Sequence, residues 1–443
     1  MRPTSFIKKV KIVAFLMVLL ASLAANSQTF NFTGKVVNSQ QQPLIGATVM
    51  VEGLEKGTSS DSEGNFTLNF SEGSYTLKIS YVGYQTVTKK ININRDQNQT
   101  FELASEDNVL DEVLVSSLRV KADAPVTHSN LTKKEIAKRN LGQDIPILLN
   151  YLPSVITSSD AGAGVGYTYI RVRGSDASRV NVTINGIPYN DAESQGTFWV
   201  NMGDFASSTQ SLQLQRGVGA STNGTGAFGA SLNILTDAIS EEAGGEISNS
   251  FGSFGTRKHT VKFTSGKLNE HFEIAGRLSN IYSDGYVDRA FTDLKSFFLQ
   301  GSYVDDNTLI KALTFGGKEQ TYQAWFGLTA DQLEEDRRQN PYTYDNETDN
   351  YWQDHYQLHW NQKLNSKIST NIGLNYTRGK GYFEQYKPEE SAEGFANLIQ
   401  DNSDVIVRRW LDNHFYVANA SGTYKSNDFE LIIGTSYSHY TND

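Results

Sequence analysis

The chain has 443 residues, a formal net charge of −10 and no cysteine. The lack of cysteine excludes disulfides, thiol catalysis, thiolate metal sites and a lipid anchor at a mature cysteine. The acidic balance argues against general nucleic-acid binding, which needs a basic surface.

The composition indicates a β-rich protein of more than one domain. Only 8 prolines stand against 37 glycines, and there are 22 tyrosines and 23 phenylalanines. Frequent turns and aromatic strand residues give such a balance, and the length predicts more than one domain.

The first 27 residues have the pattern of a secretory signal peptide. A basic start with Lys8, Lys9 and Lys11 precedes an apolar run over residues 12–25 and a small-residue cleavage site ending at Ser27. The run has about 14 residues, whereas a helix needs roughly 20 to span a bilayer, so a retained anchor is the weaker alternative. We expect an exported chain that can enter a membrane only as a β-barrel.

Residues 28–105 predict a small β-sandwich. Short alternating runs at residues 33–37, 47–51, 66–68 and 75–79 are separated by polar turns. Residues 34–36, 43–49 and 61–66 make this stretch resemble the carboxypeptidase regulatory-like domain family. That resemblance implies a non-catalytic, immunoglobulin-like module.

Residues 106–125 have a different character, since acidic residues lead into the strand-like run 113–115. One interpretation is an interdomain linker. The other is a peptide that adds as an extended strand to the sheet edge of another protein.

Residues 132–151 form the one clear helical zone. Thr132 and Glu135 have the spacing of a capping box, and Pro146 predicts a division into two short helices. The expected apolar stripe consists of Ile136, Leu141, Ile145, Leu148 and Leu149.

Residues 170–236 form a glycine-dense unit of short strands. Residues 224–229 match the G-x-G-x-x-G pattern, but a dinucleotide loop must open a helix, and residues 232–236 read as a strand. We therefore interpret these glycines as tight turns that need a positive φ.

A long meander follows from residue 241. Period-two runs occur at residues 246–251, 259–263, 272–278, 297–303, 309–315, 368–376, 415–424 and 431–440. Some connections are short and others, such as residues 318–350, are long and polar, which is typical of an outer-membrane barrel. A secreted β-sandwich or propeller is the alternative.

The sequence contains no nucleophile elbow, phosphate loop or H-E-x-x-H motif, so we expect no enzyme. His355 and His359 would stand roughly 13 Å apart on a strand, too far for one metal to bridge. We expect no metal site and no cofactor. A set of aromatic residues is predicted to line binding loops or, more simply, to form a girdle at the membrane interface. These residues are Trp199, Tyr322, Trp325, Tyr342, Tyr344, Tyr351 and Trp352.

Taken in order, residues 170–175, 185–188, 215–217 and 226–234 make the chain resemble a TonB-dependent outer-membrane receptor, as do residues 283–286 and 316–322. The implied fold is all-β dominated, with an N-terminal β-sandwich, an α+β plug domain and a partial transmembrane β-barrel of about nine of the family's 22 strands. We expect the sequence to be incomplete at its C-terminus. The implied divisions are a signal peptide (1–27), the sandwich (28–105), a linker (106–125), the plug (126–240) and the barrel (241–443).

The resemblance also implies site residues. The candidate TonB box, which would pair as a strand with TonB, is Asp111, Glu112, Val113, Leu114 and Val115. The plug motif residues are Arg171, Arg173, Gly174, Asn185, Gly186, Arg216, Gly217, Gly226 and Gly229. Arg171 and Arg173 suggest either anion contacts or buried ion pairs between plug and barrel.

The implied function is active import of a scarce solute across the outer membrane of a Gram-negative bacterium. The expected partners are TonB, outer-membrane lipid and a small solute, with no nucleic acid. An iron–siderophore complex is favoured on the breadth of the family alone, and cobalamin and oligosaccharides are alternatives. A secreted adhesion or carbohydrate-binding protein is the competing class.

Overall fold

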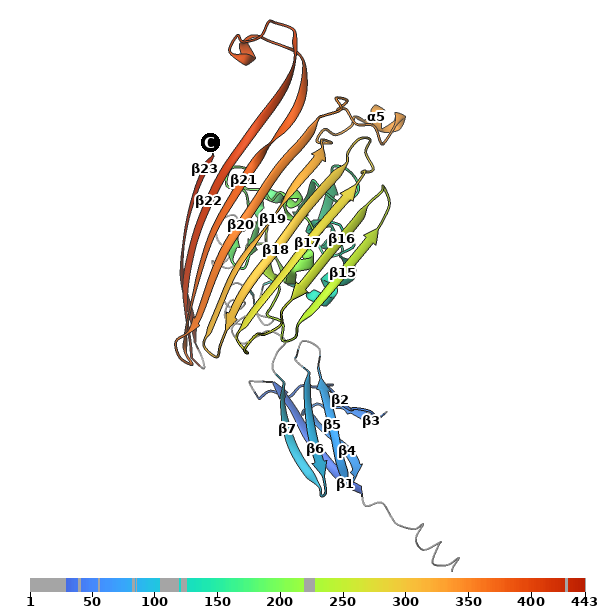
Figure 1. Cartoon of the computed structure of the whole chain (residues 1–443), viewed down its shortest axis with the longest axis vertical. Coiled ribbons are helices and arrows are strands. Elements are labelled where there is room, and N and C mark those ends of the chain that lie inside the picture. Colours follow the sequence, from blue (N-terminus) through green and yellow to red (C-terminus); the bar gives the residue numbers. More distant parts are fainter. Residues whose placement is uncertain are drawn as a thin grey trace, which may run out of the picture. The chain divides into compact units, whose positions relative to one another are not determined.

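The computed structural model describes residues 29–38, 41–54, 56–81, 84, 86–103, 119–120, 126–218, 228–426 and 429–442. The chain divides into two compact units between Val109 and Leu110. Each unit is described by itself below (Figure 1).

The first unit is a β-sandwich of two sheets, with strand orders β4-β1-β7 and β3-β2-β5-β6. The large apolar residues on its strands alternate inward, and Phe32, Phe66 and Phe101 meet in the core between the sheets. The predicted sandwich is confirmed. Its strands are β1 (Thr29–Asn38), β2 (Thr48–Val51), β3 (Lys56–Ser59), β4 (Asn65–Ser71), β5 (Gly73–Ser80), β6 (Val87–Ile93) and β7 (Gln97–Leu103).

The predicted helical zone forms two short helices, α3 (Lys133–Arg139) and α4 (Ile145–Leu148), after strand β8 (His128–Thr132). The capping box is present, because the Thr132 amide donates to the Glu135 carboxylate at 2.8 Å and the Thr132 hydroxyl accepts from the Glu135 amide at 3.4 Å. Pro146 lies in the first turn of α4, where its missing N–H leaves no bond unmade. No helix in the described part of the chain is long and apolar enough to cross a membrane.

One residue of the predicted apolar stripe was placed wrongly. Leu141 is 59% exposed because it lies in the bend after α3, where the helical spacing no longer applies. The other four members of the stripe are buried in the core of the plug.

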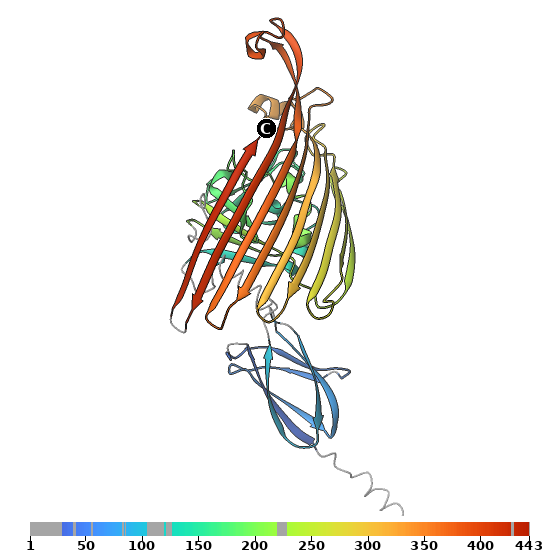
Figure 2. The ribbon, with the colours of Figure 1, turned by 60° about the vertical axis from the view of Figure 1, so that its left-hand side comes forward.

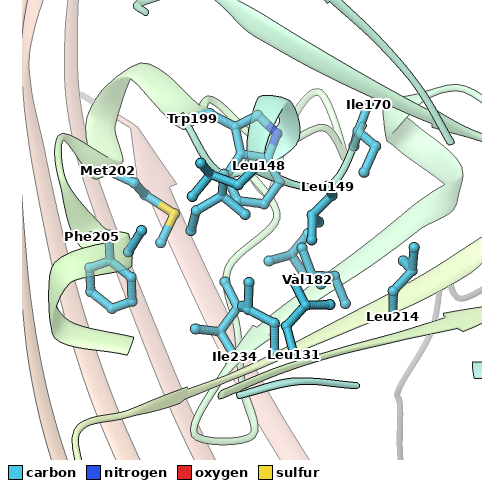
Figure 3. Close-up of a cluster of buried hydrophobic side chains, with 14 of the residues drawn as sticks. Leu131, Leu148, Leu149, Ile170, Val182, Trp199, Met202, Phe205, Leu214 and Ile234 are labelled. Carbon is cyan, nitrogen blue, oxygen red and sulfur yellow. The ribbon is translucent and has the colours of Figure 1, made fainter. Parts of the chain in front are cut away.

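The plug continues with a two-stranded sheet, β10-β9, and a five-stranded sheet, β12-β11-β14-β13-β8. Figure 3 shows Leu131, Val182, Leu214 and Ile234 of the larger sheet packed against helix α4 and Trp199. The remaining elements are β9 (Val155–Ser159), β10 (Thr168–Val172), η1 (Ala177–Arg179), β11 (Val180–Ile184), β12 (Ile187–Pro188), η2 (Trp199–Met202), η3 (Phe205–Ser208), β13 (Thr209–Arg216) and β14 (Ala230–Thr236).

Nine antiparallel strands, β15 to β23 in chain order, form one sheet that curves around the plug and is called the wall below (Figures 1 and 2). Its connections are short at one end, as at residues 305–307 and 364–367, and long at the other, where residues 323–347 contain α5 (Ala330–Glu335). The expected nine strands are confirmed. They are β15 (Gly244–Phe251), β16 (Arg257–Thr264), β17 (Phe272–Ser283), β18 (Thr292–Val304), β19 (Thr308–Tyr322), β20 (Thr348–Lys363), β21 (Ile368–Glu390), β22 (Ser403–Lys425) and β23 (Glu430–Asn442).

The wall has its polar residues inside and its apolar residues outside. On β17, Glu273 and Arg277 are at most 2% exposed, whereas Ile274 and Leu278 are 50% and 66% exposed. The same alternation gives exposed Leu299 on β18 and exposed Leu358 on β20. This is the reverse of a water-soluble sheet and is the pattern of a barrel whose outer face meets lipid.

Buried charges join the plug to the wall. Asp204, in the left-handed conformation before η3, lies 2.7 Å from Lys258 Nζ on β16 and 3.4 Å from Arg277 Nη1 on β17. All three side chains are at most 2% exposed, and Thr260 and Ser279 donate hydrogen bonds to the same carboxylate. Burial alone would raise the pKa of Asp204, but Arg277 and Lys258 hold this pKa well below its ordinary value.

A second carboxylate of the plug repeats this arrangement. Asp237, just after β14, lies 2.8 Å from Lys133 Nζ on α3 and 3.1 Å from Lys262 Nζ on β16. Lys258 and Lys262 are two inward positions apart on one strand. The inner face of β16 therefore supplies one lysine to each of the two plug carboxylates.

We predict that Asp204→Asn weakens the attachment of the plug. Asparagine keeps the size of the side chain and tolerates the positive φ of 53°, but it leaves Lys258 and Arg277 buried without a counter-charge. Loss of one partner from a buried pair costs about 3–5 kcal/mol. Denaturant-induced unfolding of the plug, followed by limited proteolysis, measures this loss.

Asp176→Asn is the matched control. Asp176 pairs with Arg179 at 2.5 Å, but both side chains are about half exposed, so solvent screens this pair and its loss should change stability little. Equal proteolytic sensitivity of the two variants would contradict the importance of the buried cluster.

Candidate functional site

The sequence-predicted site residues divide into those that the structure describes and those that it does not. The candidate TonB box, residues 111–115, and Gly226 lie outside the described residues. Asn185 and Gly186, with φ of 51° and 81°, form the two-residue turn between β11 and β12. Arg173 and Gly174, with φ of 52° and 79°, form a similar turn between Val172 and Ser175. These are the turns that demand a positive φ at both central positions.

The structure separates the arginines of the motif. Arg171 and Arg173 are exposed, and their role, as anion contacts or as ion-pair partners of the barrel, stays a prediction. Arg216 is 6% exposed, and its guanidinium donates to the Pro153 carbonyl at 2.9 Å and to the Ser129 hydroxyl at 2.7 Å. Burial, and then the charge of Arg173, lowers the pKa of Arg216. Arg216 thus fastens the end of β13 within the plug.

The glycines of the motif allow close packing. A Cβ at Gly217 would lie 3.1 Å from Arg173 Nη1, and one at Gly229 would lie 2.4 Å from the Ser175 Cβ. The strand-like reading of residues 232–236 is confirmed, because β14 follows Gly229 directly and no helix opens there. This removes the structural context of a dinucleotide site.

Arg119, shortly after the candidate TonB box, is bonded to the large sheet of the plug. Its guanidinium donates to the hydroxyl and carbonyl of Ser211 at 2.9 and 3.0 Å, and to the Asn233 carbonyl at 3.1 Å. Val120 exchanges two hydrogen bonds with the Gln213 side chain, of 2.9 and 3.0 Å. These two residues, the described part of the segment 106–125, are therefore fixed to β13 and β14.

The predicted aromatic girdle is mostly wrong. Trp199 is 1% exposed and lies in the plug core, as Figure 3 shows, and Tyr322 and Tyr351 are also buried. Only Trp352, of the set predicted, is a large exposed aromatic residue on a wall strand. Single-sequence reading cannot tell a core tryptophan from an interfacial one.

His355 and His359 lie on β20, as predicted, and both are buried. His355 contacts the Thr377 hydroxyl at 2.9 Å, and His359 contacts Gln357 at 3.1 Å. No group of three or more His, Asp or Glu side chains in the described residues has the geometry of a metal site.

One cavity lies between the plug and the wall, toward the end of the wall that carries the long connections. It has a volume of about 210 Å³. The plug contributes Tyr167, Tyr189, Asp191, Glu193, Ser194, Phe198 and Asn201, and the wall contributes Glu319, Asp349, Tyr351, Gln353, Leu411 and Asn413. This set, called the acidic pocket below, has four carboxylates, and no lysine or arginine occurs among the described residues that line it. Tyr351 was predicted to belong to a binding loop or to the girdle. The other residues of the set were not predicted, because they meet only in the folded chain.

Tyr167 is the centre of the acidic pocket. Its hydroxyl donates a short hydrogen bond to Asp349, and its ring packs edge-on against Trp325 at 5.4 Å. Burial, followed by the nearby carboxylates Glu319 and Asp349, raises the pKa of Tyr167 well above its ordinary value. Glu319 is 3% exposed, and its Oε2 has no hydrogen-bond partner within the described structure.

Two further plug carboxylates are close to this region. Asp144 is buried and accepts from the Thr168 hydroxyl at 2.9 Å, and burial raises its pKa well above the usual range. Asp160 accepts from the Tyr169 hydroxyl at 3.0 Å, and burial raises its pKa to about 6. Burial thus favours the neutral form of both carboxyl groups.

Comparison with known families agrees with this architecture. The CarboxypepD_reg-like domain matches residues 32–115, and the TonB-dependent Receptor Plug Domain matches residues 120–231. The first match extends across the candidate TonB box. Two independent domain types therefore occur in the order that the sequence predicted.

Curated relatives carry the same family name. TonB-dependent receptor P3 of Formosa agariphila is 29% identical over 109 residues, which cover 24% of this chain and 11% of the relative. TonB-dependent receptor SusC of Bacteroides thetaiotaomicron is 27% identical over 179 residues, covering 40% and 17%. A probable siderophore receptor, PirA of Acinetobacter baumannii, is 25% identical over 167 residues, covering 35% and 22%.

Solved structures show the same fold. The ferric-catecholate import receptor Fiu of Escherichia coli K12 has a TM-score of 0.55 at 15% identity, over 72% of this chain and 47% of the receptor. The ferric citrate transporter FecA has a TM-score of 0.53 at 17% identity, over 72% and 48%.

The chain thus contains a CarboxypepD_reg-like domain followed by a TonB-dependent Receptor Plug Domain, and the curated relatives that it resembles are named TonB-dependent receptors. It spans about half the length of the solved receptors and a smaller part of each curated relative.

We predict that Asp160→Asn stabilises the plug at neutral pH. The folded-state pKa of about 6 exceeds the ordinary 3.8, so the folded state holds the proton more tightly and loses stability as the pH rises from about 4 to 6. The amide keeps an acceptor for Tyr169 but cannot ionise. The gain is about 1 kcal/mol, because solvent partly screens this carboxylate.

Thermal unfolding at pH 7.5 and at pH 4 measures this difference. The variant should exceed the wild type at the higher pH and match it at the lower pH. An equal gain at both values would show that charge is not the cause.

Proposed function

We propose that the protein imports a scarce solute across the outer membrane with energy delivered by TonB. The observation that carries this proposal is the plug packed against a curved wall whose inner face is polar and whose outer face is apolar. A wall of this polarity needs lipid outside and a filled interior. The family matches support the same function.

The acidic pocket is the proposed point of solute contact. It lies between the plug and the wall strands, toward the end with long connections, and both parts supply its side chains. In an outer-membrane barrel the long loops face outward, so this end meets the external medium. A solute bound in this pocket would contact the plug and the wall together, so its binding could act directly on the plug.

The class of solute is a finer part of the proposal. The sequence favoured an iron–siderophore complex, and structural neighbours include receptors named for ferric catecholate and ferric citrate. The four carboxylates of the pocket would repel an anionic chelate. Among iron complexes, an uncharged or cationic one fits this lining better.

The proposed coupling uses the segment before the plug. TonB would add as a strand to residues 111–115 and pull on the chain. Arg119 and Val120 connect this segment to β13 and β14, so the pull would act on the large sheet of the plug. Rearrangement of the plug would then open a path beside the wall.

The competing function is a secreted adhesion or carbohydrate-binding protein. Such a protein would stay in solution once its signal peptide is removed. The exposed apolar face of the wall favours the membrane protein. Extraction of cell envelopes distinguishes the two, since a barrel appears in the supernatant only when detergent is present.

We predict that deletion of residues 111–115 abolishes solute uptake and leaves binding at the cell surface intact. TonB loses its strand partner, whereas the plug, the wall and the acidic pocket keep their contacts. Uptake and surface binding of the radiolabelled solute are measured on the same cells. The solute is first identified with a strain that lacks the whole protein, by its growth on defined iron, cobalamin and glycan sources.

The control for this deletion is a variant in which residues 111–115 are replaced by another sequence of equal length that contains no proline. Unchanged uptake in the deletion strain would remove the assignment of the box.

A further inference from the structure

We infer that the acidic pocket binds an organic cation, specifically the protonated amine of the transported solute. This inference rests on the proposed import function and names the chemical class of the ligand. It starts from the distribution of charge: Asp191 and Glu193 come from the plug, and Glu319 and Asp349 come from wall strands β19 and β20.

The carboxylates of the pocket lack the cations that neutralise other buried carboxylates of this protein. Asp204 and Asp237 each have two basic partners within 3.4 Å. By contrast, no lysine or arginine lines the acidic pocket in the described chain. A buried carboxylate is costly unless it is paired or protonated, and a bound cation would supply the pairing that the described lining of this pocket lacks.

Glu319 is the sharpest part of the argument. It is 3% exposed, and its Oε2 accepts no hydrogen bond in the described structure. Its neighbour Asp349, which is 8% exposed, is held by the Tyr167 hydroxyl. A donor that enters the pocket would complete the bonding of Glu319 and lie close to Asp349 at the same time.

The remaining lining suits an amine better than a bare metal ion. Tyr167, Tyr189 and Tyr351 offer aromatic faces and hydroxyls, and aromatic faces attract organic cations. No described cluster of His, Asp or Glu has metal-binding geometry. At about 210 Å³ the pocket holds one terminal group of a solute and not a large ligand as a whole.

Equilibrium binding to the detergent-solubilised native protein tests this inference with spermidine as the cationic probe. Its triacetylated analogue is the neutral control and ferric citrate is the anionic control. Calorimetry near neutral pH should show spermidine binding at least tenfold more tightly than either control. Glu319→Gln and Asp349→Asn, which keep side-chain size, should each weaken spermidine binding about tenfold and leave the analogue unaffected.

Glu334→Gln, on the exposed helix α5, is the matched variant and should bind spermidine like the wild type. A melting temperature near that of the wild type confirms that each variant folds. Equal binding of spermidine and its analogue, no binding of spermidine, or the same loss in all three variants would overturn the inference.

These outcomes are independent of TonB, because binding at equilibrium needs no energy source. Failure of the cation preference with uptake still dependent on residues 111–115 overturns only the ligand class. Uptake that persists without those residues overturns the proposed function and leaves the binding result standing.

Discussion

Charge pairing across the boundary between plug and wall is the constraint on which this structure depends. A wall with an apolar outer face must put its polar side chains inside, and in the absence of water those side chains need partners. Lys258 and Arg277 find theirs in Asp204, and Lys262 finds its partner in Asp237. The plug is therefore more than an obstruction, since it completes the bonding of the inner face.

The same need of buried charges for partners explains why the acidic pocket suits a ligand. Where the plug meets β16 and β17, carboxylates and cations are matched, and the contact is closed. Where it meets β19 and β20, carboxylates face one another around Tyr167 without basic residues in the lining. One protein thus has a balanced and an unbalanced contact between the same two parts. The balanced contact suits attachment, and the unbalanced one suits a ligand.

Local rules explain what the sequence could predict. Thr132 and Glu135 are three residues apart, and Asn185 and Gly186 are adjacent, so each feature is fixed within one turn of chain. The alternation of the wall strands is equally local. Asp204 and Glu319 could not be predicted, because each acquires its role from strands more than 25 residues away. Trp199 was misplaced for the same reason, since core and membrane interface both accept a tryptophan.

Buried pairing also explains why import through such a protein would need external work. Loss of one partner from the buried Asp204 cluster costs about 3–5 kcal/mol, and the partly exposed Asp237 contact holds the plug at a second place along β16. Thermal fluctuation rarely breaks both at once, because every 1.4 kcal/mol lowers the open population tenfold. A pull applied through Arg119 reaches β13 and β14, and Asp237 lies directly after β14. Asp204 in turn directly precedes η3 and β13, so force on this sheet would load both contacts of the plug with β16.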